Sequence, residues 1–388
     1  MSRVHKRESQ PYVSDHSSPS STASQPFVDE PSHMASLAYA WGKPDVTGEL
    51  RQNDADFQVD EERGFELSGE GEHVLLQIRK QQLNTDQVAR QLARLAQVQA
   101  RDVSFSGMKD KHALTTQWFS VHLPGKLEPD WQLLNNEQVQ VLQHTRHRQK
   151  LRRGSHRRNH FVIVLRGVLQ EVSRELLREL QPQAQGMHEL IEQRLQTIAQ
   201  QGVPNYFGAQ RFGNREGNIA KAGAMLRGER RIKDRQQRSL YLSTARALLF
   251  NKVLSQRVMQ CNWNQALAGD ALMLNGTHSF FIAEQIDDEI AQRLALHDIH
   301  PSGPLWGRGE LATQAAVRML ESDALAGDAD LCAGLEQAGL KQERRALRLL
   351  AEDLSWQWLA DDALQLRFAL QRGAYATSVI RECCSAHA

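Results

Sequence analysis

Apolar and polar residues alternate in short stretches of the N-terminal half. In "GEHVLLQIRK" the residues Val74, Leu76 and Ile78 fall on one side of an extended chain, which predicts a strand. Apolar residues then recur at helical spacing over about 86–98, after a possible cap at Asn84 or Thr85. "DVSFS", "TQWFSVHL" and "HFVIVLR" predict further strands.

From about Gln183 to Leu349 the spacing becomes mostly helical. Examples are "MHELIEQRLQTIAQQG", "STARALLFNKVLSQRV" and "ERRALRLLAEDL", and strand-like alternation returns in "LQLRFAL". The pattern predicts an α+β protein with mixed strand pairing. We expect one β-rich domain in two parts, 34–184 and 350–388, interrupted by a mostly helical insertion at 185–349.

Residues 1–33 differ in composition from the rest of the chain. This stretch is polar, rich in Ser and Pro, and lacks the apolar core of a signal peptide, so we expect a disordered extension. No apolar stretch approaches the roughly 20 residues of a membrane span. The four cysteines form no CxxC pair and the histidines show no zinc-ligand spacing. We therefore expect a cytoplasmic protein with reduced thiols, no metal site and no membrane contact, and we expect a monomer.

Basic residues cluster in two runs although the net charge is only +1. The first run, "HTRHRQKLRRGSHRR" at 144–158, holds seven Arg or Lys residues, and the second is "RGERRIKDRQQR" at 227–238. Arginine-rich runs bind phosphates, although a solvated charged surface is the alternative. We predict an RNA partner whose backbone is contacted by Arg146, Arg148, Lys150, Arg152 and Arg153.

"GMKDKHALTTQ" places Asp110 between Lys109 and Lys111, just after Gly107. Glycine permits a tight turn, and the flanking charge keeps a carboxylate ionised even when it is partly buried. An ordinary surface turn is the alternative, because Asp, Lys and Gly are common turn residues.

Aromatic residues lie in or beside these polar and basic segments, where rings can stack on unpaired bases. They are Phe57, Phe161, Tyr206, Phe207, Phe212 and Tyr375. Each could equally be a core residue. On a strand, however, Asn159 and Phe161 face the same way, so a ring could stack on a base while the amide reads its edge.

Five segments together resemble the TruD family of tRNA pseudouridine synthases. The first is G-x-K-D-x-x-A-x-T-x-Q, which fits residues 107–117. The others are "RQNDADFQVDEE", "NHF", "NYFGAQRFG" and "FALQRGAYATSVIRE", and all five occur in the family order. The similarity covers about Leu37 to Glu382. The N-terminal extension and extra residues in the distal insertion have no counterpart in the family.

This resemblance implies a pseudouridine synthase catalytic domain with a mixed, largely antiparallel sheet, and a family-specific insertion, the TRUD domain. It implies that Asp110 is the catalytic aspartate and that the target uridine is contacted by Phe57, Asn159, Phe161 and Tyr375. Arg51, at a basic position where the family often has lysine, and Lys109 are expected near the substrate.

The implied reaction is the isomerisation of uridine 13 of tRNA. It adds and removes nothing, so we expect neither cofactor nor metal. The carboxylate could attack C1′ or C6, or remove the C2′ proton, and the sequence leaves all three open. A non-catalytic RNA-binding protein, such as an RNA chaperone, is the alternative function. A metal-dependent nuclease would need clustered carboxylates, and the Asp110 motif supplies one.

Overall fold

A ten-stranded sheet organises the protein. The computed structural model describes residues 32–168, 184–360 and 362–387. The main strand order is β14-β15-β7-β2-β5-β3-β6, with β1, β4 and β16 attached beside it. Among the described strand pairs of this sheet, β2 with β5 and β1 with β16 are parallel and the others are antiparallel. The predicted α+β class and largely antiparallel sheet are therefore confirmed. The strands are β1 (Thr47–Leu50), β2 (Phe57–Arg63), β3 (His73–Lys80), β4 (Val103–Phe105), β5 (Leu114–His122), β6 (Val139–His147), β7 (His156–Arg166), β14 (Glu352–Ala360), β15 (Ala363–Gln371) and β16 (Ser385–His387).

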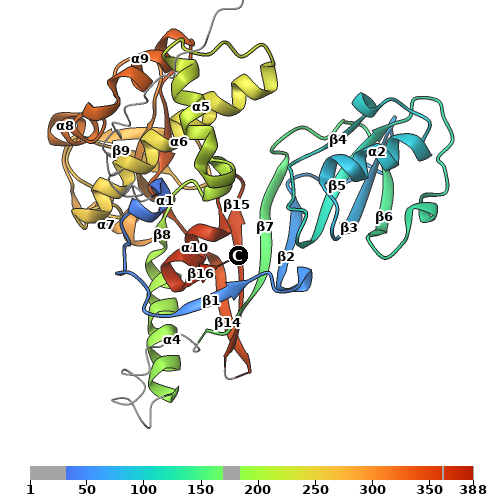
Figure 1. Ribbon diagram of the computed structural model, residues 1–388, viewed down its shortest axis with the longest axis horizontal. Helices are drawn as coiled ribbons and strands as arrows, with labels where there is room; N and C mark the ends of the chain where they lie inside the picture. Colours follow the sequence, from blue (N-terminus) through green and yellow to red (C-terminus); the bar gives the residue numbers. More distant parts are fainter. Residues whose placement is uncertain (1–31, 169–183, 361, 388) are drawn as a thin grey trace, which may run out of the picture.

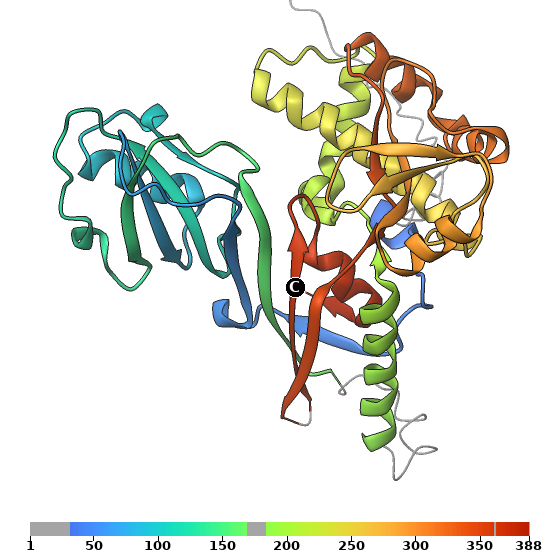
Figure 2. The same ribbon diagram turned by 180° about the vertical axis from the view of Figure 1, so that it is seen from behind.

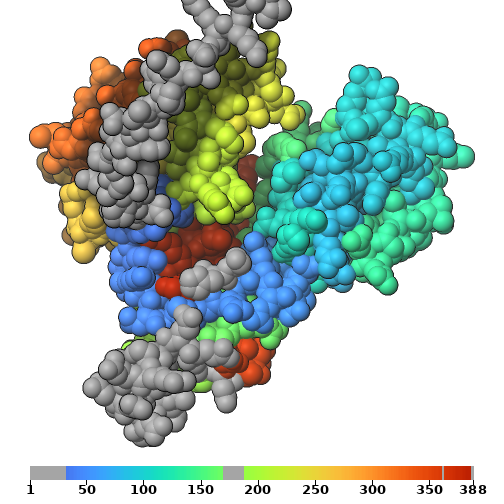
Figure 3. Space-filling model, viewed as in Figure 1, coloured from blue at the N-terminus to red at the C-terminus, as the bar shows by residue number. Residues whose placement is uncertain are grey.

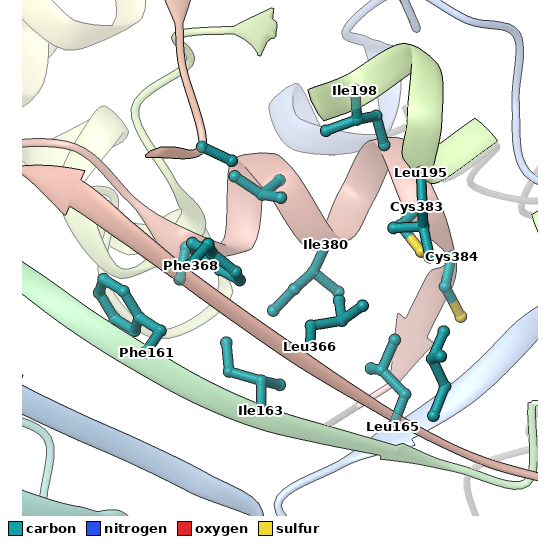
Figure 4. Close-up of a cluster of buried hydrophobic side chains, with 14 of the residues drawn as sticks. Phe161, Ile163, Leu165, Leu195, Ile198, Leu366, Phe368, Ile380, Cys383 and Cys384 are labelled. Carbon is teal, nitrogen blue, oxygen red and sulfur yellow. The ribbon is translucent and has the colours of Figure 1, made fainter. Parts of the chain in front are cut away.

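One face of this sheet carries two separate hydrophobic clusters. The first joins β2, β7 and β15 to α4 (Ala184–Gln201) and α10 (Ala376–Cys383). Figure 4 shows the side chains that β7, β15, α4 and α10 contribute to it. The second joins β3, β4 and β5 to α2 (Thr85–Leu95), which fits the helix predicted over about 86–98. Figure 1 shows β2 and β7 running between these two parts of the molecule.

Polar side chains lie on the same sheet face, between the two clusters. Cross-strand pairing aligns Val59 with Thr115 and Thr115 with Lys80, and it aligns Ile78 with Gln117. Thr115 and Gln117 are fully buried and Lys80 is 1% exposed. Buried polar groups require partners, so the middle of the sheet is where a network of contacts, and a site, is expected.

The insertion joins β7 to β14 and contains its own small sheet. Its helices are α5 (Gly217–Leu226), α6 (Arg235–Met259), α7 (Asp288–Ala295), α8 (Ala315–Ala324) and α9 (Ala329–Gln337). The small sheet has the order β10-β9-β11-β12, and β8 pairs with β13 nearby. These strands are β8 (Val203–Pro204), β9 (Asp270–Leu274), β10 (Phe280–Ala283), β11 (Ile299–Leu305), β12 (Glu343–Ala346) and β13 (Arg348–Leu349). Figure 2 shows the insertion packed beside α10 and β15.

The helix predicted for "ERRALRLLAEDL" is wrong. This segment forms β12 and β13 and then begins β14. Its Arg, Leu, Glu and Ala residues favour helix locally, but the edge of β11 supplies hydrogen-bonding partners from Ser302 to Leu305. Arg344 is then buried against Glu321, with 2.7 Å between Nη2 and Oε1.

The N-terminal extension predicted for 1–33 lies outside the described residues except for Ser32 and His33. His33 begins α1 (His33–Ser36) and is held in place, so the extension ends before it. Its backbone N–H donates to Glu216 Oε2 at 2.8 Å, and its ring packs against Phe212 at 5.1 Å. All four cysteines are free thiols, as predicted. In the described part of the chain, no helix is long and apolar enough to cross a membrane.

Candidate active site

Asp110 lies in the loop between β4 and β5 and forms an ion pair with Arg51. Its Oδ2 is 2.6 Å from Arg51 Nη2, and the two side chains are 39% and 29% exposed. Arg51 has a left-handed backbone, with φ at 62°, and its guanidinium also sits 4.2 Å from the centre of the Phe57 ring. A non-glycine residue at positive φ is strained and persists where its surroundings hold it. The carboxylate is thus paired and still open to solvent.

Lys109 turns away from Asp110 and into the sheet. Its Nζ is 2.8 Å from Glu61 Oε2, and the two side chains are only 7% and 1% exposed. Glu61 also accepts the backbone N–H of Trp118 at 3.3 Å. The pair fastens the Asp110 loop to β2 and β5. A substrate contact by Lys109, as predicted, would require its ammonium to leave this pair.

Lys80 is a site residue that the sequence analysis missed. It ends β3, and its Nζ donates to the backbone carbonyl of Asp110 at 2.8 Å. Burial lowers the pKa of Lys80 to about 8, while the charge of Asp110 opposes this shift and that of Lys109 adds to it. The register between β3 and β5 could have revealed Lys80, because it pairs this residue with Thr115, which belongs to the Asp110 motif.

Thr85 of α2 and Gln117 of the motif fix the shape of the loop. Thr85 Oγ1 accepts the Lys109 backbone N–H at 2.9 Å and donates to Gln117 Oε1 at 2.9 Å. Gln117 Nε2 donates to the Gly107 carbonyl at 3.1 Å. The glutamine at the end of the motif therefore closes the loop in which Asp110 lies.

The predicted pair on β7 does face one way. Phe161 aligns with Val59 on one side and Phe368 on the other, and Asn159 aligns with Glu61. The Phe161 ring stacks on Phe368 at 5.4 Å and meets the Phe57 ring edge-on at 6.2 Å. Phe161 and Phe57 are 8% and 4% exposed, so both belong to the rim of the first hydrophobic cluster.

Asn159 has an unused acceptor. Its Nδ2 lies 3.4 Å from His156 Nε2, but Oδ1 is buried and has no hydrogen-bond partner among the described residues. Burial also lowers the pKa of His156. A buried amide oxygen without a partner is costly, which suggests a position that a ligand completes.

Tyr375 stands just before α10, beside the insertion. Arg211 donates to its hydroxyl oxygen through Nε at 3.1 Å and Nη2 at 2.9 Å. Its ring meets that of Phe207 at 6.0 Å. Gly208 allows this approach, because a Cβ there would lie 2.7 Å from Thr377 Oγ1 and 3.2 Å from the Tyr375 ring. The "NYFGAQRFG" segment thus positions Tyr375.

The five predicted RNA-backbone residues lie on β6 and on the connection to β7. Arg146 binds Glu128 at 2.6 Å and also donates to the carbonyls of Leu123 and Lys126. Arg148 is paired with Glu70, Lys150 donates to the Arg101 carbonyl, and Arg153 covers the Phe105 ring. Arg152 is exposed and has no side-chain partner in the described ranges. Most of this run is therefore engaged within the protein.

Comparison with known proteins identifies the family. A family model described as tRNA pseudouridine synthase D (TruD) matches residues 34–231 and 230–383. Since these ranges span most of the chain, the protein belongs to the TruD family, which confirms the resemblance seen in the sequence.

Relatives agree along nearly their whole length. The tRNA pseudouridine synthase D of Nitrosococcus oceani is 49% identical over 348 residues, covering 89% of this chain and 93% of the relative. That of Aeromonas hydrophila is 47% identical over 349 residues, covering 90% and 94%. A crystal structure from Methanosarcina mazei, described as a tRNA pseudouridine synthase D, matches with a TM-score of 0.65 and 21% identity, covering 89% of this chain and 95% of that one. At this identity it supports the fold alone.

Proposed function

We propose that this protein converts uridine 13 of tRNA to pseudouridine, with Asp110 as the catalytic group and without a cofactor. The observation that supports this most directly is the Asp110 carboxylate, 2.6 Å from Arg51 and partly open to solvent, within the loop that defines the family motif. The relatives' names supply the tRNA substrate.

The chemistry of uridine isomerisation accounts for the ion pair between Asp110 and Arg51. The N1–C1′ bond of uridine breaks, the base turns, and a C5–C1′ bond forms; C5 loses its proton and N1 ends with one, so the atoms balance. The protein must supply an ionised carboxylate at the sugar or base, in a pocket that phosphates make more negative. Arg51 provides the positive charge that such a carboxylate needs. Asp110 acts by attack on C1′, by attack on C6, or by removal of the C2′ proton.

Recognition of the base falls to the residues beside this pair. The target nucleotide must leave its stack to reach them. The free Oδ1 of Asn159 can accept the N3–H of uracil, which is the donor on the edge of that base. Phe57 and Phe161 form the apolar wall, and Tyr375 approaches from the start of α10, where Arg211 of the insertion holds its hydroxyl.

Backbone contacts complete the proposal. We assign them to the run predicted from the sequence, in which Arg152 is free and Lys150 and Arg153 are exposed. Arg146 and Arg148 would first have to release Glu128 and Glu70. A non-catalytic RNA-binding protein is the alternative, but it would have no use for an arginine held on Asp110.

The test is to incubate purified protein with unmodified tRNA, with and without EDTA, and to map pseudouridine. Product at position 13 is expected under both conditions. Asp110→Asn keeps the size of the side chain but removes its charge, so turnover should vanish while tRNA affinity persists. Loss of product with EDTA would contradict the cofactor-free reaction, and substantial turnover by Asp110→Asn would contradict the role of the carboxylate.

A further inference from the structure

We propose that the segment joining α5 to α6, together with the first turn of α6, is a second binding surface for the RNA backbone, separate from the catalytic loop. We call it the α6 basic cluster, and it consists of Arg230, Arg231, Lys233, Arg235 and Arg238. This inference rests on the proposed function. It adds a second place on the protein at which the RNA substrate is bound.

The charges of the cluster are free. All five side chains are exposed, and none has an ion pair or side-chain hydrogen bond with any residue in 32–168, 184–360 or 362–387. The neighbouring acids already have partners. Glu229 and Asp330 pair with Arg227, and Asp234 caps α6 by accepting the Gln237 backbone N–H at 2.6 Å.

The cluster is also concave. Its five basic residues surround a surface recess of about 730 Å³, together with Met225, Gly228 and Ile232. A recess lined by five cations concentrates the local potential more than a flat surface does. It therefore suits a compact anionic group such as a phosphate.

The contrast with the run at 144–158 decides which basic surface offers more free charge. There, Arg146 and Arg148 are bound to carboxylates. An arginine in an ion pair must give up its partner before it binds phosphate, whereas a free one releases only the counterions of the RNA. The second run thus offers the larger group of unengaged cations.

The position of the cluster fits the same substrate. Ser243 of α6 accepts a hydrogen bond from Arg211 at 3.1 Å, and Arg211 holds Tyr375. Arg235 precedes Ser243 by eight residues, or about 12 Å along the helix. Figures 1 and 2 both show the start of α6 turned toward the part built from β3 to β6 and α2, and Figure 3 shows the surface indented between them. RNA at the catalytic loop would therefore lie alongside the cluster.

RNA is the occupant we favour over an acidic protein. Four of the five cations are arginines, whose planar fork matches the phosphate group. The family's substrate is itself a polyanion that extends well beyond one nucleotide.

The test is the triple variant Arg230→Gln/Arg231→Gln/Lys233→Gln, which leaves α6 itself unchanged. The control, Arg293→Gln/Arg318→Gln/Lys341→Gln, removes equal charge from the same insertion outside the recess, and two of its cations, Arg293 and Arg318, are already engaged in ion pairs. Affinity for unmodified tRNA is measured from about 50 to 200 mM salt. Each lost phosphate contact should lower the slope of log K against log salt by about 0.7–0.9, so the triple variant should lose about 2–3 relative to the control. Its single-turnover rate at saturating tRNA should stay unchanged.

Three results would overturn the inference. One is a salt slope equal to that of the control, in a wild-type protein that forms pseudouridine. Another is a changed single-turnover rate at saturation, which would place the cluster in the chemical step. The third is unchanged tRNA binding with lost affinity for poly-glutamate, which would indicate an acidic protein partner. If the wild type forms no pseudouridine in tRNA, the proposed function fails instead, whatever the slopes are.

Discussion

Replacement of Lys109 by methionine should destabilise the protein rather than weaken substrate binding alone. In the structure the Lys109 ammonium is 2.8 Å from Glu61, and the two side chains are 7% and 1% exposed. Methionine fills similar space but leaves the Glu61 carboxylate buried without a positive partner. The Glu61 carboxylate would then keep only its hydrogen bond from the Trp118 backbone N–H.

The magnitude follows from that burial. Breaking one side of a buried ion pair costs about 3–5 kcal/mol, because the remaining charge is uncompensated. At roughly 2 °C for each kcal/mol in a large chain, Tm should fall by about 6–10 °C. Lys109→Met/Glu61→Gln removes both charges and keeps an acceptor for Trp118, so it should recover most of the loss.

Thermal unfolding of the wild type, both single variants and the double variant measures this coupling. Lys111→Met is the control, because that lysine is the exposed neighbour, and it should change stability by less than about 0.5 kcal/mol. A Lys109→Met protein as stable as the wild type, with a raised KM for tRNA, would refute the reasoning. It would place the ammonium on the substrate, as the sequence had predicted.

Three further predictions concern the Phe161 ring, the contact between the insertion and Tyr375, and the loss of stability in acid. Phe161→Leu should keep stability within about 1.5 kcal/mol but weaken capture of the base by about 1–3 kcal/mol; unchanged capture would leave the ring a core residue only. Gly208→Ala should displace the Tyr375 ring and lower kcat/KM by about tenfold, whereas Gly217→Ala, with no atom within 4 Å of the added Cβ, should not; equal activities would contradict the packing. Burial lowers the pKa of His300 to about 3. Between about pH 6.5 and pH 3 only the unfolded chain takes up this proton, so stability falls by up to about 1.4 kcal/mol for each pH unit through that window. His300→Asn should flatten that dependence in acid denaturation, and an identical slope would show that the ring does not resist protonation.

The spacing of apolar residues predicted those strands and helices that have one regular apolar face. Alternation identified β3 and β15, and helical spacing identified α2. The strands β9, β10 and β11 were missed, although the Asn275-Gly276 pair, a common turn signal, lies in the connection between the first two. "ERRALRLLAEDL" was mistaken because its helical preference is local, while its pairing with β11 is not.

The site shows the same division. The sequence motifs predicted Asp110 and the pair Asn159 and Phe161, which face the same way, as site residues. They could not reveal that Lys109 points inward or that Lys80 holds the Asp110 carbonyl, because both facts depend on the register between strands. Residues 30 apart in sequence meet only once the sheet has formed.

The insertion also sets the order in which the protein can be assembled during synthesis. β7 pairs on one side with β15, so Ile163 can pair only after Leu366, about 200 residues later in the chain, has been synthesised. At about 5–20 residues per second the ribosome needs roughly 10–40 s to deliver that partner. Until then one edge of β7 is unpaired and the cluster beneath Phe161 lacks Phe368 and all of α10. A nascent chain therefore contains the Asp110 loop long before β15 and α10 emerge to complete the first hydrophobic cluster.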